Sequence, residues 1–146
     1  MPVPPEYERA SAKFYEFLTA ARDLADLQTT HQAYTMTEGV LLAFRRRLTV
    51  QQALDFANEL PLLLRALFVS DWDTEEPRRE FGDRAAMTQE VKGLRADHNW
   101  SPDNSIAAVA EALRGHVYPD RFAAMLTRLP PAATGFWREA LEPSGP

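Results

Sequence analysis

The chain of 146 residues contains no cysteine. This absence excludes thiol catalysis, zinc–thiolate and iron–sulfur ligation, and disulfide bonds. Long apolar runs are also missing, because the longest, near residues 60–69, is interrupted by Arg65 and is too short to span a bilayer. The first residues lack a basic region followed by an apolar run, so we expect no secretory signal and no membrane association. The sequence therefore predicts a cytoplasmic protein.

Several patterns that carry chemistry are absent as well. The six glycines are scattered, so there is no glycine-rich phosphate loop, and no Gly-x-Ser-x-Gly motif marks a nucleophile. The three histidines, His31, His98 and His116, show no metal-ligand spacing. We therefore expect no catalytic residue, no cofactor and no metal. These absences favour a non-enzymatic protein and leave an enzyme of unrecognised type open.

The composition is that of a folded protein with an acidic surface. Hydrophobic residues make up 45% of the chain and charged residues 25%, which is too apolar for a disordered chain. A chain of this length buries roughly two-thirds of its unfolded surface, so it needs no metal or disulfide to fold. The net charge of −5 argues against a nucleic-acid partner, because phosphate binding needs clustered positive charge.

Apolar residues recur at three- and four-residue steps along most of the chain, which is the spacing of amphipathic helices. Strand signals are scarce. Thr49 with Gln52 three residues later fits a capping box, and Ser101 suits the N-cap before Pro102. The sequence predicts an all-α fold of seven or eight helices. The apolar stripes cover residues 7–25, 36–48, 50–60, 62–69, 81–94, 102–117, 119–126 and 132–141.

Two Leu-Pro junctions, Leu60-Pro61 and Leu129-Pro130, indicate an internal repeat with an offset of 69 residues (60 to 129). With this offset, residues 36–68 align with residues 105–137 without a gap, and the helix breaks coincide. We expect two tandem units, one about 6–70 and the other about 78–142, joined by a connector at 71–77. The units would pack face to face as one globular bundle, so that residues 1–146 form a single helical domain.

The segment after the first junction, residues 62–69, is apolar nearly all round, whereas its counterpart keeps one polar side. Such a helix lies in the centre of a core or in a subunit interface. The core is the simpler interpretation. If the segment is an interface, the candidate residues are Leu62, Leu63, Leu67, Phe68 and Trp72.

The basic run Arg45-Arg46-Arg47 lies at the end of a predicted helix, where the helix dipole stabilises cations. Successive helical side chains point about 100° apart, so the run does not form one patch. A site for an anionic partner is the alternative. Because the repeat retains Arg45 as Arg114, we expect an ion pair common to both units. Its acceptor in the first unit would be Glu38, Glu59 or Asp55.

The acidic connector that begins at Asp71 superficially resembles the start of a calcium-binding loop. Such a loop needs Gly at its sixth position and Glu at its twelfth, and these positions hold Glu76 and Gly82. We interpret the connector as a solvated acidic loop before a helix N-terminus, where the dipole favours negative charge.

Around the Leu-Pro junctions the chain resembles the bacterial family known as domain of unknown function 2267. The resemblance is carried by residues 48–53, 59–65 and 68–72, and more loosely by Leu129-Pro130 and Phe136-Trp137. The second half departs from the usual pattern in the Pro-Ala-Ala-Thr of residues 131–134. The resemblance implies an all-helical fold, and the family has no established activity to carry over.

Two functional hypotheses follow. The leading one is a non-enzymatic protein-interaction or scaffold module, with a protein partner or a second copy of the chain. The alternative is a small-molecule-binding protein, or an unrecognised enzyme, with a pocket between the two units.

Overall fold

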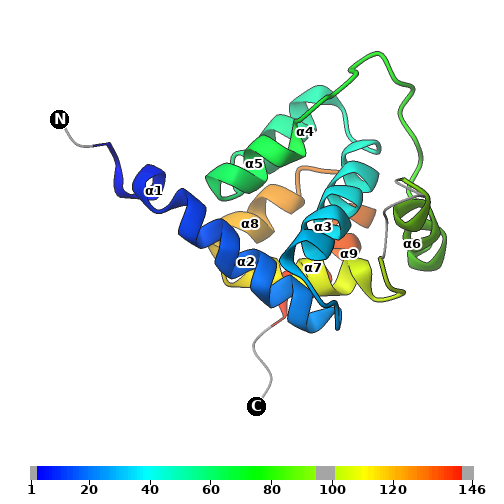
Figure 1. Cartoon of the computed structure of the whole chain (residues 1–146). Helices are drawn as coiled ribbons and strands as arrows, with labels where there is room; N and C mark the ends of the chain where they lie inside the picture. The colour runs from blue at the N-terminus through cyan, green and yellow to red at the C-terminus, as the bar shows by residue number, and fades with distance from the viewer. Residues whose placement is uncertain (1–2, 95–100, 143–146) are drawn as a thin grey trace.

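The computed structural model describes residues 3–94 and 101–142, and every regular element among them is an α-helix (Figure 1). The all-α prediction is therefore confirmed. His98 and Trp100 lie outside the described residues. The helices are α1 (Pro5–Glu8), α2 (Ala10–Leu24), α3 (Thr30–Arg45), α4 (Val50–Ala57), α5 (Leu62–Phe68), α6 (Arg84–Gly93), α7 (Ser105–Arg114), α8 (Pro119–Leu126), α9 (Ala132–Phe136) and α10 (Arg138–Leu141).

The described residues form ten helices instead of the seven or eight that the sequence predicts. Both extra elements come from breaks inside predicted helices. Arg9 (φ −98°, ψ 2°) separates α1 from α2, and Trp137 (φ −103°, ψ 19°) separates α9 from α10. Periodicity missed these breaks because a single residue outside the helical region hardly changes the spacing of the apolar stripe.

Side-chain caps fix the starts of α3 and α4. Thr29 caps α3 and Thr49 caps α4, each in a reciprocal capping box with the glutamine three residues later. The capping box at Thr49 confirms the prediction. The structure places two other starts later than predicted. Asp83 caps α6, which begins at Arg84, and α7 begins at Ser105 after Asn104 instead of near Ser101.

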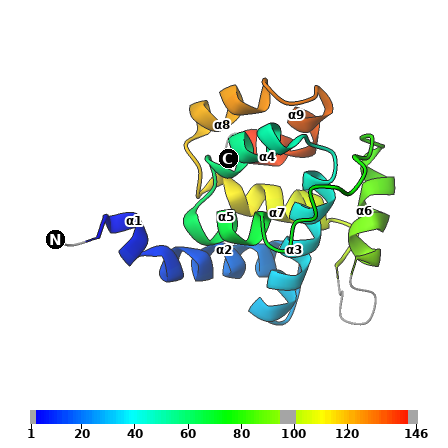
Figure 2. The same cartoon turned by 90° about the horizontal axis from the view of Figure 1, so that it is seen from above.

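Helix α3 lies at the centre of the molecule. It packs against α2, α5, α6 and α7. Seen from above, α2 and α8 lie on opposite sides, with α5 and α7 between them (Figure 2). Helix α5, the candidate for a central helix, is buried on one side only: Leu64 and Phe68 are 2% and 1% exposed, whereas Leu63 is 37% exposed.

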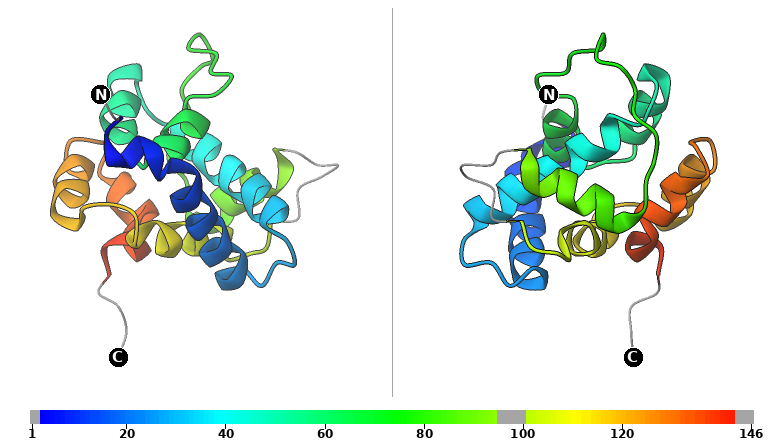
Figure 3. Two further views of the ribbon diagram at one scale, coloured as in Figure 1. Left: turned by 60° about the vertical axis from the view of Figure 1, so that its left-hand side comes forward. Right: turned by 90° about the vertical axis from the view of Figure 1, so that its right-hand side faces the viewer.

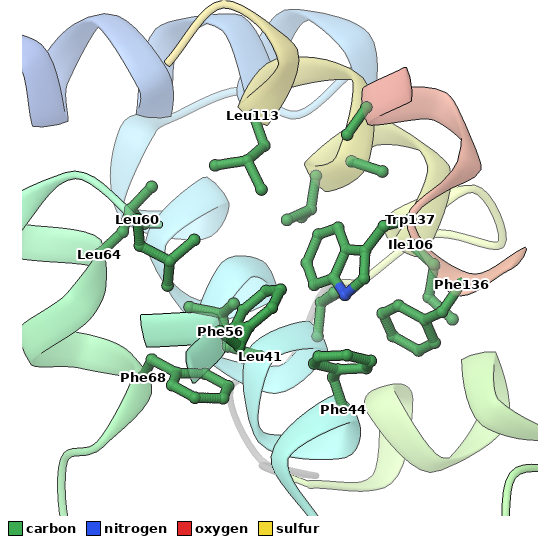
Figure 4. Close-up of a cluster of buried hydrophobic side chains, with 14 of the residues drawn as sticks. Leu41, Phe44, Phe56, Leu60, Leu64, Phe68, Ile106, Leu113, Phe136 and Trp137 are labelled. Carbon is green, nitrogen blue, oxygen red and sulfur yellow. The ribbon is translucent and has the colours of Figure 1, made fainter. Parts of the chain in front are cut away.

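An aromatic cluster joins the two halves of the sequence in one continuous core (Figure 4). Phe44, Phe56 and Phe68 come from the first half, and Phe122, Phe136 and Trp137 come from the second. Contacting ring centroids are 4.7 to 6.4 Å apart. These distances are in the range in which aromatic pairs attract each other. The seam between the halves is therefore filled by side chains.

Two features stand outside this core. Helix α1 extends away from the body and has no buried residue. A long segment without regular structure, residues 69–83, crosses the outside of the molecule from α5 to α6 (Figure 3). We call this segment the α5–α6 loop. The sequence predicts a helix that includes Phe81, but Phe81 lies in the loop and contacts Phe44 at a centroid distance of 6.1 Å.

Candidate functional site

Two neighbouring, partly open cavities lie between α3 and the α5–α6 loop. We name them the Trp72 cavity, of about 210 Å³, and the Leu67 cavity, of about 260 Å³. Arg45, Arg46, Asp73 and Glu76 line both. The Trp72 cavity is further lined by Leu48, Thr49, Val50, Trp72, Thr74, Pro77 and Arg78. The Leu67 cavity is further lined by Thr35, Glu38, Gly39, Leu42, Leu67, Phe68, Ser70, Asp71 and Leu94.

Arg45, the last residue of α3, is the most buried charged group at these cavities, with 5% of its surface exposed. Its hydrogen bonds to described residues use Nη1, which donates to the carbonyl oxygens of Phe68 at 2.9 Å and Ser70 at 3.1 Å. Its guanidinium carbon lies 5.2 Å from the ring centroid of Trp72. Arg45 therefore fastens the end of α5 and the start of the loop to α3.

These contacts leave the buried cation incompletely compensated. Within the described part of the chain, no carboxylate oxygen lies within 4.0 Å of the Arg45 guanidinium, and its Nε is buried without a hydrogen-bond partner. Burial lowers the pKa of Arg45, and the charge of Glu76 opposes this effect. The side chain stays protonated at any physiological pH. Burying a charge without a paired opposite charge costs free energy, so this arrangement calls for a compensating group.

The other two arginines of the run hold the loop in place. Arg46 Nε lies 3.2 Å from Glu76 Oε1, and the Arg46 carbonyl accepts the backbone N–H of Arg79 at 2.9 Å. Arg47 donates to Glu90 Oε2 at 2.8 Å and to the carbonyl of Glu80 at 3.1 Å. The three side chains thus point to different partners, as the helical spacing predicts.

Glu90 on α6 accepts hydrogen bonds from two arginines, Arg47 and Arg79. Arg79 Nη1 lies 2.6 Å from Glu90 Oε1, an oxygen to which Arg47 Nη2 also donates at 3.4 Å. Burial alone would raise the pKa of Glu90, but the hydrogen bonds and charges of Arg47 and Arg79 outweigh it and leave the pKa lowered. Ion pairs and hydrogen bonds therefore connect the loop beside the cavities to both α3 and α6.

Arg114, the counterpart of Arg45, has a related set of contacts at the end of α7. Its Nη1 donates to the carbonyl oxygens of Glu139 at 3.5 Å and Glu142 at 2.8 Å. Arg45 and Ser70, and likewise Arg114 and Glu139, are 25 residues apart. Unlike Arg45, Arg114 also has a carboxylate neighbour, because its Nη2 lies 3.6 Å from Glu111 Oε1.

The acceptors of Arg45 are main-chain carbonyls, whereas the sequence predicts a carboxylate. Of the proposed acceptors, Glu59 pairs with Arg121 at 3.3 Å, and Asp55 accepts from the Gln51 side chain at 3.0 Å. Carbonyl oxygens at a helix end are favourable partners for a cation, and they carry no signal in the sequence. The sequence does indicate that Arg45 is buried, because it follows the buried Leu41 by four residues and so lies on the apolar stripe of α3.

The candidate interface residues are dispersed. Phe68 is 1% exposed and belongs to the core, whereas Leu63 is 37% exposed and lies at a shallow groove between α2 and α5. Leu62 and Leu67 are half-buried. Trp72 is also half-buried and forms a wall of the cavity that carries its name. Trp72, Leu67 and Phe68 thus line cavities beside Arg45, and Leu63 faces another part of the surface.

Two further properties concern residues 3–94 and 101–142 as a whole. No helix there is both long and apolar enough to cross a membrane. No group of three or more histidine, aspartate or glutamate side chains in the same residues is arranged to hold a metal ion.

The fold and the cavities define a class of protein: an all-helical domain with two small, charged cavities beneath a tethered loop. The chain matches the family model described as uncharacterized conserved protein (DUF2267) over residues 14–136. This match covers most of the chain, and the protein belongs to that family. The comparison with curated proteins gave no match.

Proposed function

We propose that this protein is a non-catalytic binding domain for a small molecule, with its site in the Trp72 and Leu67 cavities. The observation that carries the proposal is the position of two neighbouring cavities, which share four charged lining residues, beside an anchored loop. Each cavity is larger than an apolar cavity of about 150 Å³ that holds benzene. Both are smaller than typical drug-sized sites of about 300–1,000 Å³, so the ligand is small.

The lining suits a ligand with both polar and apolar parts. Leu42, Leu67 and Phe68 provide apolar surface to one cavity, and Trp72 provides an aromatic wall to the other. Ligand sites combine such surfaces with a few fixed polar groups that set orientation. The pocket of the sequence-based alternative was expected between the two units. These cavities belong instead to the first unit and the loop, with Arg78 and Leu94 as the contributions from the second.

The test is a binding screen by two-dimensional ¹H–¹⁵N NMR with small anionic, neutral and cationic compounds. The Trp72 indole N–H reports on the cavity, and Trp72→Phe identifies its signal. The Trp137 indole, which is fully buried in the aromatic cluster, is an internal control. We expect at least one compound to shift the Trp72 indole and the amides of α3 and the loop, with Trp137 unchanged. A screen in which no compound moves these signals would contradict the proposal.

The second candidate is the leading hypothesis from the sequence, a protein-interaction module. It is favoured by apolar side chains that the chain leaves uncovered at α1 and α2: Val3, Tyr7 and Tyr15 are 53%, 56% and 60% exposed. Exposed Leu63 lies beside α2 in the shallow groove. The partner we propose is a second copy of the chain. Light scattering across a concentration series would show a dimer that Leu63→Glu weakens, and a strict monomer at all concentrations would reject this candidate.

We further propose that the two halves are an internal duplication and fold as one domain. Helices α4 and α8 are both eight residues long and are offset by 69 residues at each end (50 to 119 and 57 to 126). Helices α3 and α7 end with the same offset (45 to 114). A chimera in which residues 50–57 replace residues 119–126 should keep a single cooperative unfolding transition. Loss of cooperative folding in that chimera would contradict the equivalence of the two helices.

A further inference from the structure

The two cavities differ in the sign of their charge. Arg45, Arg46 and Arg78 line the Trp72 cavity with only two carboxylates, those of Asp73 and Glu76. The Leu67 cavity lacks Arg78 and is lined by two further carboxylates, those of Glu38 on α3 and Asp71 in the loop. An anionic group would therefore be favoured in the Trp72 cavity.

The carboxylates next to Arg45 are already engaged elsewhere. Glu76 pairs with Arg46 at 3.2 Å, and Asp73 Oδ1 accepts the backbone N–H of Glu75 at 3.0 Å. Asp71 Oδ2 lies 3.5 Å from the Ser70 hydroxyl. Of these, Glu76 and Asp71 act on Arg45 only through longer-range charge interactions, and the buried Nε has no acceptor among the described residues. Buried donors of this kind are rare in proteins, because leaving one unpaired costs its full desolvation penalty.

In the second half of the chain, the equivalent arginine is Arg114, and it has a carboxylate neighbour on its own helix. Glu111 lies three residues before Arg114 and pairs with it. With the offset of 69 residues, the position equivalent to Glu111 is Leu42. Leu42 lines the Leu67 cavity beside Arg45 and supplies no charge. The first half therefore lacks the carboxylate that the second half has, and it has cavities at the corresponding place.

We infer that the Trp72 cavity binds the anionic group of a small molecule, a carboxylate or a phosphate, with Arg45 as its principal anchor. This inference rests on the proposed function and names its ligand class. Arg78, which has no ion pair within the described residues, and the hydroxyl-bearing Thr49 and Thr74 line the same cavity. Nη1 of Arg45 is engaged by two carbonyl oxygens and Nε is buried, so Nη2 is the donor that remains for a charge-assisted hydrogen bond to such a group.

The experiment uses the full chain and four probes. Benzoate, benzyl alcohol and benzylamine have similar shape and differ in charge, and inorganic phosphate represents the second kind of anion. Dissociation constants are measured by NMR titration at low ionic strength, where the attraction between charges is least screened. We expect benzoate, phosphate or both to bind at the Trp72 indole, and to bind at least tenfold more tightly than benzyl alcohol and benzylamine. Which of the two anions binds decides between a carboxylate and a phosphate ligand.

Two substitutions and two matched controls test the role of Arg45. Arg45→Met keeps an unbranched side chain against Trp72 and removes the charge, and Leu42→Glu reproduces the internal carboxylate of the second half. Each should weaken anion binding at least tenfold. Arg114→Met removes the equivalent cation, which does not line either cavity. Leu54→Glu places the same new charge on an exposed position of α4. Both controls should bind anions as the unmodified chain does.

The possible results separate this inference from the proposed function. If benzyl alcohol or benzylamine shifts the Trp72 indole and neither anion does, the anion inference is overturned and the proposed function stands. If no compound in the wider screen moves these signals, both are overturned. If Arg45→Met fails to fold, Leu42→Glu still decides, because unchanged anion affinity in that folded variant would overturn the assignment of Arg45.

Discussion

The aromatic cluster offers a quantitative test of the claim that both halves share one core. Trp137 is fully buried and contacts two rings from each half, those of Phe44, Phe56, Phe122 and Phe136, at centroid distances of 5.1 to 6.4 Å. Replacing a buried tryptophan by alanine costs about 3–5 kcal/mol, because apolar contacts are lost and a cavity remains. At about 2–4 °C per kcal/mol for a chain of this size, Trp137→Ala should lower Tm by about 6–20 °C.

Trp137→Phe should cost much less, for a reason specific to this site. The buried indole Nε1 has no hydrogen-bond partner within residues 3–94 and 101–142, and Figure 4 shows it directed toward the rings of Phe44 and Phe136. An unsatisfied buried donor carries a penalty of about 1–3 kcal/mol, and phenylalanine removes it. This gain offsets part of the lost volume, so we expect a net cost of about 1 kcal/mol.

The assay is chemical and thermal unfolding followed by circular dichroism and by calorimetry. One transition is expected for the unmodified chain and for both variants, since the cluster draws on both halves. Two resolved transitions, with only one of them shifted by Trp137→Ala, would refute the shared core. Equal losses for Trp137→Phe and Trp137→Ala would refute the account of the indole N–H.

Three further outcomes follow from the contacts described above. Thr49→Ala should cost about 1 kcal/mol in an unfolding titration because it removes a capping box, and Thr29→Ala should cost a similar amount. Glu90→Gln should cost about 1–3 kcal/mol through weaker charge-assisted hydrogen bonds, measured against the exposed control Gln89→Ala. Burial would raise the pKa values of Glu90 and Glu139, but the arginines that donate to these carboxylates leave both pKa values below the ordinary 4.5; the partners of Glu139 are Arg84 and Arg138. Their stabilisation should therefore be complete above pH 4.5 and be lost as pH falls through the folded-state values. Glu90→Gln should reduce this acid dependence in a pH series of unfolding titrations, and an unchanged series would contradict it.

The sequence predicts the helices well where periodicity and caps agree. Helix α4 begins after its capping threonine, Thr49, and α8 begins at Pro119, as expected. The end of the α5–α6 loop could not be predicted in this way, because Phe81 continues an apolar stripe although tertiary contact with Phe44 holds it outside a helix. Hydrophobic spacing records which residues are buried, and it does not record whether a helix or a loop brings them to the core.

The candidate site was visible in the sequence only in part. The pair Arg45 and Arg114 follows from the offset of 69 residues, and the basic run leaves an anionic partner open as the alternative. Their acceptors could not be predicted, since they are main-chain carbonyls brought close by the packing of α5 against α3 and of α10 against α7. The cavities depend on the path of the α5–α6 loop, which is fixed by long-range ion pairs such as Arg47–Glu90.

The central claim is that a small anion occupies the Trp72 cavity and is held by Arg45. A crystal structure of the protein soaked with whichever of benzoate and phosphate binds more tightly tests it most directly. We predict an oxygen of the anion within hydrogen-bond distance of Arg45 Nη2, beside Trp72. Density for the anion only outside this cavity, or none at saturating concentration, would contradict the claim.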